Sequence, residues 1–209
     1  MRIVKFGHAC VRLEKDSGTL VIDPGAFSEL ESADAADGIL LTHEHLDHFD
    51  PERLRRADSP IFTGVRTAVV VVAEAPDLAE RITTVGDGVS FEVAGFSVSA
   101  HGEHHALIHP DIPRVANTAF LVDGEVFHPG DSFTPPPARV PTLLMPLNAP
   151  WMRLAEAIDF ARRHSGRRAV AIHDGLLNDT GLMVSGGNAG RLLGTHDIEY
   201  VRVEPGSEL

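Results

Sequence analysis

The sequence has a single cysteine and no long apolar run, and both absences exclude classes of protein. Cys10 is the only cysteine, so neither an intrachain disulfide nor a cysteine-based zinc finger can form. No apolar stretch approaches the roughly 20 residues that a membrane-spanning helix needs. The opening segment, Met1–Gly7, becomes polar too soon for a secretion signal. We therefore expect a cytoplasmic protein without membrane contacts.

Basic residues are too few to balance the acidic ones. The 18 Lys and Arg stand against 30 Asp and Glu, which gives a formal charge of −12. A surface of that sign repels a phosphate backbone, so nucleic acid is not a favoured partner. The 209 residues contain no repeat and no linker-like stretch, and 43% of them are hydrophobic. We expect one domain over residues 1–209, and the sequence leaves its oligomeric state open.

Short apolar or alternating runs, cut by Gly, Asp and Pro, predict strands through much of the chain. The expected strands cover residues 2–6, 9–14, 19–22, 39–41, 142–145, 169–172 and 199–203. Two hairpins are expected over residues 89–100 and 118–128, with turns at Gly95 and Gly124.

Three helices are expected between the strands. Asp50 followed by Pro51 is a typical helix start and predicts a short helix over residues 51–56. Residues 151–164 carry apolar side chains at helical spacing, with charged residues on the other face. Residues 66–74 are ambiguous, because four consecutive valines favour a strand while the flanking polar residues allow a helix. We favour the helix there.

The densest group of the 12 histidines follows the apolar run of residues 38–41 and reads Thr-His-Glu-His-Leu-Asp-His. It offers four metal ligands within six residues, namely His43, His45, Asp47 and His48. On a tight loop past a strand end all four can converge, and alternate side chains of a strand share a face. Imidazole and carboxylate together suit zinc, manganese or iron. The segment predicts a metal site; the alternative is a solvated polar loop.

The order strand, His-X-His-X-Asp-His, helix resembles the metallo-β-lactamase superfamily. The resemblance implies an α+β fold, a four-layer αββα sandwich, with two adjacent divalent metal ions. His43 and His45 would bind the first ion, and Asp47 and His48 the second. Two later residues match further ligands of the superfamily. Asp131, in Phe127–Ser132, would bridge the ions, and His173 would be the last ligand.

The remaining ligand is expected within residues 101–109, which contain four histidines. A position just past the strand that ends near Ala100 suits His101. However, residues 102–113 resemble the lactonase-like branch related to ascorbate-6-phosphate lactonase, where the matching residue is His105. We favour His105, with His101 as the alternative ligand and His104 as a weaker one. All of them can also be ordinary polar loop residues.

The likeness to this branch extends from about residue 2 to about residue 178, and the tail from residue 182 carries no usable motif. Its other matching segments are residues 6–10, 21–25, 117–121, 148–151 and 172–175. Asp23 and His8 are expected to support the ligands by hydrogen bonding from behind, because a metal-bound imidazole usually donates its other N–H. The side chains expected to line the pocket, any of which can instead be structural, are Asn117, His128 and Trp151.

The resemblance implies a hydrolase in which a metal-bridged hydroxide attacks a small ester, lactone or phosphoester, with Asp47 and Asp131 as catalytic residues. Zinc is the first expectation for the two ions, with manganese or iron as alternatives. Arg114 and Arg139 are the cationic candidates for contact with an anionic substrate. Two other functions stay open: a phosphodiesterase or nuclease on the same metals, and a non-catalytic metal-binding sensor domain.

Overall fold

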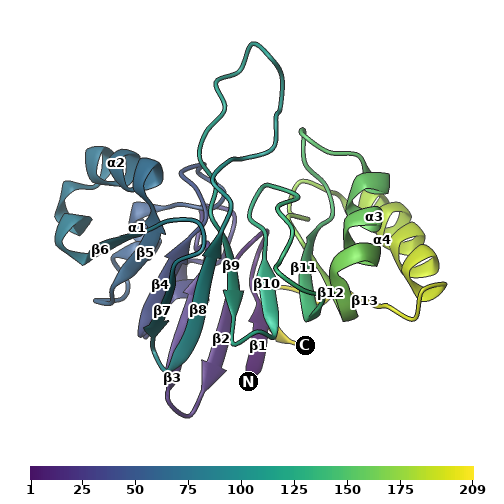
Figure 1. The fold of residues 1–209 in the computed structure, drawn as a ribbon, viewed down its shortest axis with the longest axis horizontal. Coiled ribbons are helices and arrows are strands. Elements are labelled where there is room, and N and C mark those ends of the chain that lie inside the picture. The colour runs from purple at the N-terminus through teal and green to yellow at the C-terminus, as the bar shows by residue number, and fades with distance from the viewer.

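A computed structural model of the chain describes residues 1–209 and contains two seven-stranded sheets that pack face to face (Figure 1). The first sheet has the order β14-β1-β2-β3-β4-β5-β6. Its strands are β1 (Arg2–Lys5), β2 (Val11–Lys15), β3 (Gly18–Ile22), β4 (Gly38–Leu41), β5 (Ile61–Gly64), β6 (Ile82–Val85) and β14 (Ser207–Glu208).

The second sheet has the order β13-β12-β11-β10-β9-β8-β7. Its strands are β7 (Ser90–Val93), β8 (Phe96–His101), β9 (Ala119–Val122), β10 (Val126–His128), β11 (Val140–Pro146), β12 (Ser165–Ile172) and β13 (Glu199–Val201). The α-helices are α1 (Pro51–Leu54), α2 (Val65–Glu74), α3 (Leu154–His164) and α4 (Asp179–Gly194), and the short 3₁₀ helices are η1 (Leu30–Ala33) and η2 (Pro76–Arg81).

Three apolar clusters hold the layers together, and their positions confirm the predicted four-layer αββα sandwich. The central cluster of 17 buried residues fills the space between the sheets and includes Leu20 and Phe120. A cluster of 12 packs α1, α2 and η2 on the first sheet, and one of 15 packs α3 and α4 on the second. Figure 1 shows the two pairs of α-helices on opposite sides of the sheets. All four residues of β4 are buried because both faces of its sheet are covered.

The expected helix over residues 66–74 is confirmed as α2, whereas α4 was not predicted. Residues 179–194 contain five glycines, each of which disfavours a helix by about 1 kcal/mol relative to alanine. Tertiary packing outweighs that cost, because Ala189 and Leu193 are buried against the second sheet. Asn178 caps the first turn by accepting a hydrogen bond from the Gly181 amide at 2.9 Å. The expected helix over 151–164 begins later, at Leu154.

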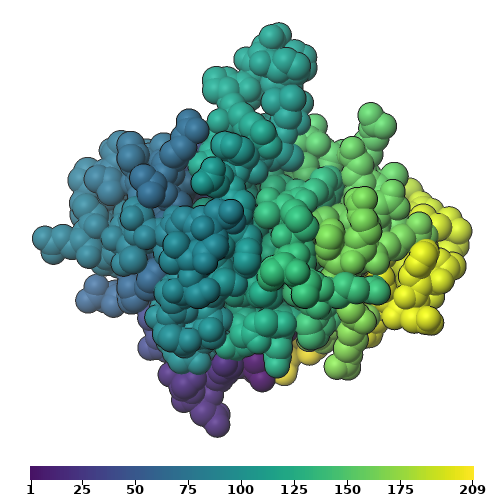
Figure 2. Space-filling view, viewed as in Figure 1, coloured from purple at the N-terminus to yellow at the C-terminus, as the bar shows by residue number.

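The carboxyl ends of the parallel strands of both sheets lie at the same edge. β3, β4, β5 and β6 run parallel to one another, as do β10, β11, β12 and β13. Ligands of such sheets commonly bind beyond the carboxyl ends of the strands. The segment of residues 102–118, between β8 and β9, rises above this edge as a projection (Figures 1 and 2).

None of the helices has the length and apolar character needed to cross a lipid bilayer.

A buried ion pair ties the first strand to the segment after β12. The ammonium group of Lys5, which is fully buried, lies 3.0 Å from Asp174 Oδ1 and also donates to the Phe6 carbonyl at 2.8 Å. The other oxygen of Asp174 accepts from Arg202 Nε at 2.9 Å. Every charge in this contact has a partner, as burial requires.

Replacing Asp174 by Ala should lower the free energy of unfolding by about 3–5 kcal/mol, because the buried Lys5 ammonium loses its counter-charge. Urea denaturation of the metal-free protein measures the loss. Arg2→Ala is the matched control, since it removes ion pairs with Glu14 and Glu208 that are exposed to water. An equal loss in the two variants would show that burial of the Lys5 pair contributes nothing.

Candidate metal centre

The segments that follow β4, β8, β10 and β12 meet at the common edge of the sheets and bring together all seven residues predicted as ligands. Together with His8 they form two groups of four, and within each group the possible ligand atoms lie within 4.8 Å of one another. The first group is His43, His45, His105 and Asp131, and the second is His8, Asp47, His48 and His173. His45 and Asp47 are partly exposed, and the other six are buried. The loops therefore gather two small clusters at one edge.

Three of these imidazoles have their protons fixed by an acceptor behind the ring. A carbonyl or carboxylate oxygen only accepts, so the nitrogen next to it carries the proton and the other nitrogen keeps its lone pair. The contacts run from His48 Nδ1 to Asp23 Oδ2 at 2.7 Å, from His173 Nδ1 to the Asn148 carbonyl at 2.6 Å, and from His105 Nδ1 to the Ala106 carbonyl at 2.5 Å. In each neutral ring Nε2 is left as a lone-pair donor.

The lone pairs that result face one another without partners. His48 Nε2, His105 Nε2, His173 Nε2 and Asp131 Oδ1 are buried and make no hydrogen bond. Unpartnered buried polar atoms are rare in folded proteins because each costs on the order of 1–3 kcal/mol. Bound cations would satisfy all of these atoms, and three imidazoles with carboxylates are ligands that zinc, manganese and iron accept. The residues present therefore fit divalent metal ions.

His43 and His45 approach each other through ring nitrogens. Thr42 Oγ1 donates to Asp23 Oδ2 at 2.6 Å, so it accepts the proton of His43 Nδ1 at 3.0 Å. His43 Nε2 is then a lone-pair donor, and it lies 3.1 Å from His45 Nδ1. This short distance between the two nitrogens is stable only if His45 Nδ1 donates a hydrogen bond to His43 Nε2 or if both nitrogens bind one metal ion.

Asp23 organises the loop after β4 from below. Its Oδ1 accepts the Thr42 amide at 2.8 Å, and its Oδ2 accepts from both Thr42 and His48. The carboxylate is fully buried, so these contacts fix it in one orientation. Asp23 thus holds His48 from behind, in the way expected of a supporting residue. Thr42 was not identified from the sequence as a functional residue. Its position directly after β4 was the only feature of the sequence that pointed to such a role.

His8 lies in the second group but has no lone pair to offer a metal when neutral. Its Nδ1 accepts from the Gly175 amide at 3.2 Å, which places the proton on Nε2. That Nε2 donates to Asp47 Oδ2 at 3.0 Å. The contacts favour the supporting role for His8, with Asp47 as the residue it holds.

Asn117 and His128 take the structural role that the sequence left open beside a place in the pocket wall. Both are fully buried and hold the backbone of the loop that carries Asp131. Asn117 Oδ1 accepts from the Asp131 amide at 2.9 Å, and His128 Nδ1 accepts from the Gly130 amide at 3.0 Å. Gly130 has a positive φ of 59°, and a Cβ there would lie 2.2 Å from Asn117 Oδ1, so only glycine fits this turn.

Asp131 and the imidazoles around it shift one another's pKa values. Burial opposes ionisation of Asp131, but the nearby His48 and His173 outweigh it and hold the pKa of this carboxyl well below its usual range. Burial likewise opposes protonation of His173, yet Asp131 raises the pKa of this imidazole to about 9. The pKa of His43 is well below its ordinary value, because it is buried beside other imidazoles. The carboxylate of Asp131 therefore favours positive charge at this point, and bound metal ions would supply it in place of protons.

The other sequence candidates lie outside the two groups. His101 belongs to the end of β8, where its Nε2 hydrogen-bonds with Ser99 Oγ at 2.9 Å, and His104 is exposed. The guanidinium of Arg114 is engaged with the His105 carbonyl. Arg139 was expected near the substrate, but it donates to the Ser165 carbonyl, 3.0 Å from its Nε, at the start of β12 and therefore at the opposite end of that strand from His173. Of the alternatives for the remaining ligand, only His105 lies in a candidate metal group.

The family model of the beta-lactamase superfamily domain matches residues 2–173. Protein Rv0786c of Mycobacterium tuberculosis is 36% identical over 186 residues, which cover 85% of each chain. A UPF0173 metal-dependent hydrolase of Geobacillus thermodenitrificans is 45% identical over 53 residues, or 23% of this chain and 24% of the relative.

Among solved structures, Igni18, a metallo hydrolase of the archaeon Ignicoccus hospitalis, aligns with a TM-score of 0.75. The alignment covers 100% of this chain and 97% of Igni18, at 18% identity, so it supports the fold alone. The family model, by contrast, spans most of the chain and reaches His173, the last of the predicted ligands. The His-X-His-X-Asp-His segment and the αββα sandwich agree with that match, and the chain belongs to the metallo-β-lactamase superfamily.

Proposed function

We propose that this metal-dependent hydrolase cleaves a small neutral ester or lactone at a centre of two divalent metal ions. His43, His45, His105 and Asp131 would hold one ion, and Asp47, His48 and His173, with Asp131 shared, would hold the other. The observation that supports the proposal is the convergence of buried, unpartnered donor atoms from four separate loops. Zinc is the first expectation, with manganese or iron as alternatives.

Bound divalent ions would supply Lewis acidity, which polarises a carbonyl oxygen and brings the pKa of a water toward neutrality. The chain supplies the geometry. Asp131 reaches both groups, with Oδ1 at 3.1 Å from His48 Nε2 and Oδ2 at 3.3 Å from His105 Nε2. The side chain of Asp47 is 18% exposed, so of the two carboxylates it is the one that can pass a proton to solvent.

Neutral carbonyl substrates suit the surroundings better than phosphoesters do. Arg114 is occupied by the His105 carbonyl, Arg139 lies elsewhere, and the net charge of −12 disfavours polyanions. Apolar side chains stand exposed close to the ligands instead. Leu46, between His45 and Asp47, is 61% exposed, and Phe27, with its ring 5.3 Å from that of His8, is 43% exposed. The place of the chain in the lactonase-like branch stays a prediction.

Metal content decides between the candidate ligands. After reconstitution with zinc or manganese, wild-type protein should carry close to two ions per chain by elemental analysis. His105→Ala should lose at least one of them, because it removes a donor from the first group. His101→Ala is the matched control and should retain both, since His101 is engaged with Ser99. Loss of metal in the His101 variant instead would reverse the assignment, and a ratio well below one in wild-type would end the two-metal proposal.

Asp131→Ala should lower kcat by at least about 100-fold on whichever lactone or ester of a test panel the wild-type protein cleaves, because removal of a ligand costs more than removal of its hydrogen-bond partner. Far-ultraviolet circular dichroism should remain unchanged. A panel that contains lactones, aryl esters and bis-aryl phosphodiesters tests the substrate class. Faster turnover of the phosphodiester would favour the phosphodiesterase alternative. Absence of turnover on every substrate, with a lower melting temperature in the variant, would favour a structural or sensory metal site.

A further inference from the structure

Trp151, the only tryptophan, makes a direct contact with the carboxylate at the middle of the centre. It lies in the segment between β11 and α3, and its indole Nε1–H donates to Asp131 Oδ2 at 2.8 Å. The sequence suggested only that Trp151 lines the pocket. The structure shows instead that the residue is 9% exposed and that its polar atom is aimed at a predicted ligand.

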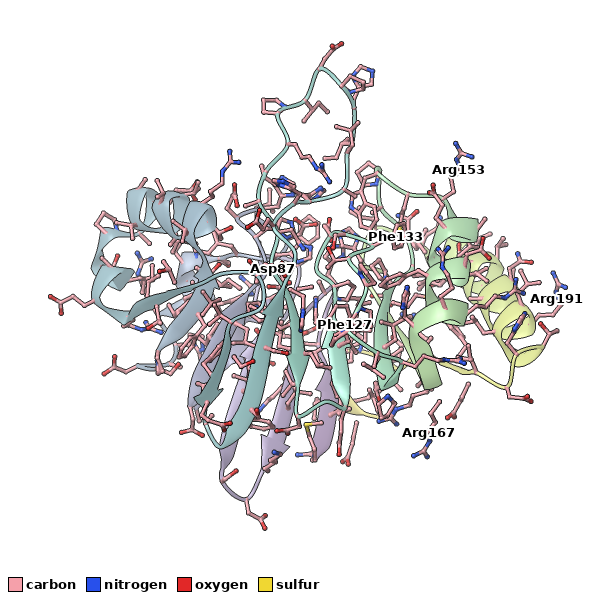
Figure 3. The ribbon with its side chains drawn as sticks, in the orientation of Figure 1. Asp87, Phe127, Phe133, Arg153, Arg167 and Arg191 are labelled. Atoms are coloured by element: carbon pink, nitrogen blue, oxygen red, sulfur yellow. The ribbon has the colours of Figure 1, made fainter.

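Aromatic packing fixes the direction of this indole. The ring of Phe133 packs edge-on against that of Trp151 at 5.2 Å, and Phe160 of α3 lies 5.3 Å from Phe133. Figure 3 labels Phe133 at the end of the second sheet where the loops converge. Phe160 belongs to the outer apolar cluster of that sheet. The core beneath α3 thus constrains where the Trp151 N–H points, because Phe133 packs edge to face on the indole and is itself held by Phe160.

The hydrogen bond matters because Asp131 Oδ2 faces both ligand groups. Oδ2 lies 3.3 Å from His105 Nε2 and 3.1 Å from His173 Nε2. A carboxylate oxygen has two lone pairs. Without Trp151, both lone pairs of Oδ2 would be free, and this one oxygen could contact both ions while Oδ1 contacted none.

We propose that Trp151 is a positioning residue for Asp131, which acts by occupying one lone pair of Oδ2. A single lone pair of Oδ2 would then remain for one metal ion, and Oδ1, which has no hydrogen-bond partner, would be left for the other. The inference rests on the proposed two-metal function. It adds a physical reason why each oxygen of Asp131 would contact a different metal ion.

The first test is zinc affinity, measured by competition with a chromophoric chelator. Trp151→Phe keeps an aromatic ring beside Phe133 but removes the N–H, and it should weaken binding of at least one zinc ion by about 10- to 100-fold, the usual cost of losing a partner behind a metal ligand. Phe91→Leu is the control for a general loss of aromatic packing, because its ring stacks on that of Phe62 at 4.5 Å in β7, a strand that carries no candidate ligand, and it should leave the affinity unchanged. Equal affinity of Trp151→Phe and wild-type protein for both ions would overturn the inference.

The second test needs no variant. A single tryptophan gives a single indole N–H signal in a ¹⁵N–¹H correlation spectrum of uniformly labelled wild-type protein. That proton should exchange slowly with deuterium in the metal-free protein, and its signal should move as zinc is added. Rapid exchange, or no shift while zinc binds, would overturn the inference. Failure of wild-type protein to bind zinc, manganese or iron would instead refute the proposed function.

Discussion

Buried nitrogen and oxygen atoms that lie close together without a hydrogen-bond partner are the constraint on which the rest of this structure depends. Three ring nitrogens and one carboxylate oxygen converge unpartnered at one edge of the sandwich. Such atoms have given up their hydrogen bonds to water, so the surrounding fold must hold them together. The acceptors behind the rings fix the orientation of each imidazole. The cluster of 17 apolar residues between the sheets fixes the positions of the loops relative to one another. Bound cations convert this unfavourable arrangement into a favourable one.

The sequence was informative where candidate ligands lie close together in the chain or directly follow a strand. Residues 43–48 could be recognised because their candidate ligands lie in one loop, and Asp131 and His173 because apolar strands precede them. The choice between His101 and His105 depended on the strand end. β8 runs to residue 101 and pairs His101 with Ala119, so this side chain belongs to the ladder and the turn that follows delivers His105 instead.

Other features could not be predicted, because they arise from contacts between distant segments. The bond from Trp151 to Asp131 depends on how the segment before α3 meets the loop after β10. The contacts of Asn117 and His128 with the backbone could not be predicted from the sequence either. The same types of polar residue hold loops in some proteins and line pockets in others. Helix α4 is glycine-rich and forms only because the second sheet offers an apolar surface. Local propensity gave no sign of it.

The contact between Lys5 and Asp174 has a consequence for the order in which the molecule is assembled. These residues are 169 positions apart, and the amide of His173 donates to the carbonyl of His8 at 3.0 Å. During synthesis the first ligand group is complete in the emerging chain once Asp131 has been made, whereas the second must await residue 173. Contacts between segments so far apart in the chain form slowly compared with hairpins and helices. Until residue 173 has been added, the nascent polypeptide therefore contains only the first of the two ligand groups.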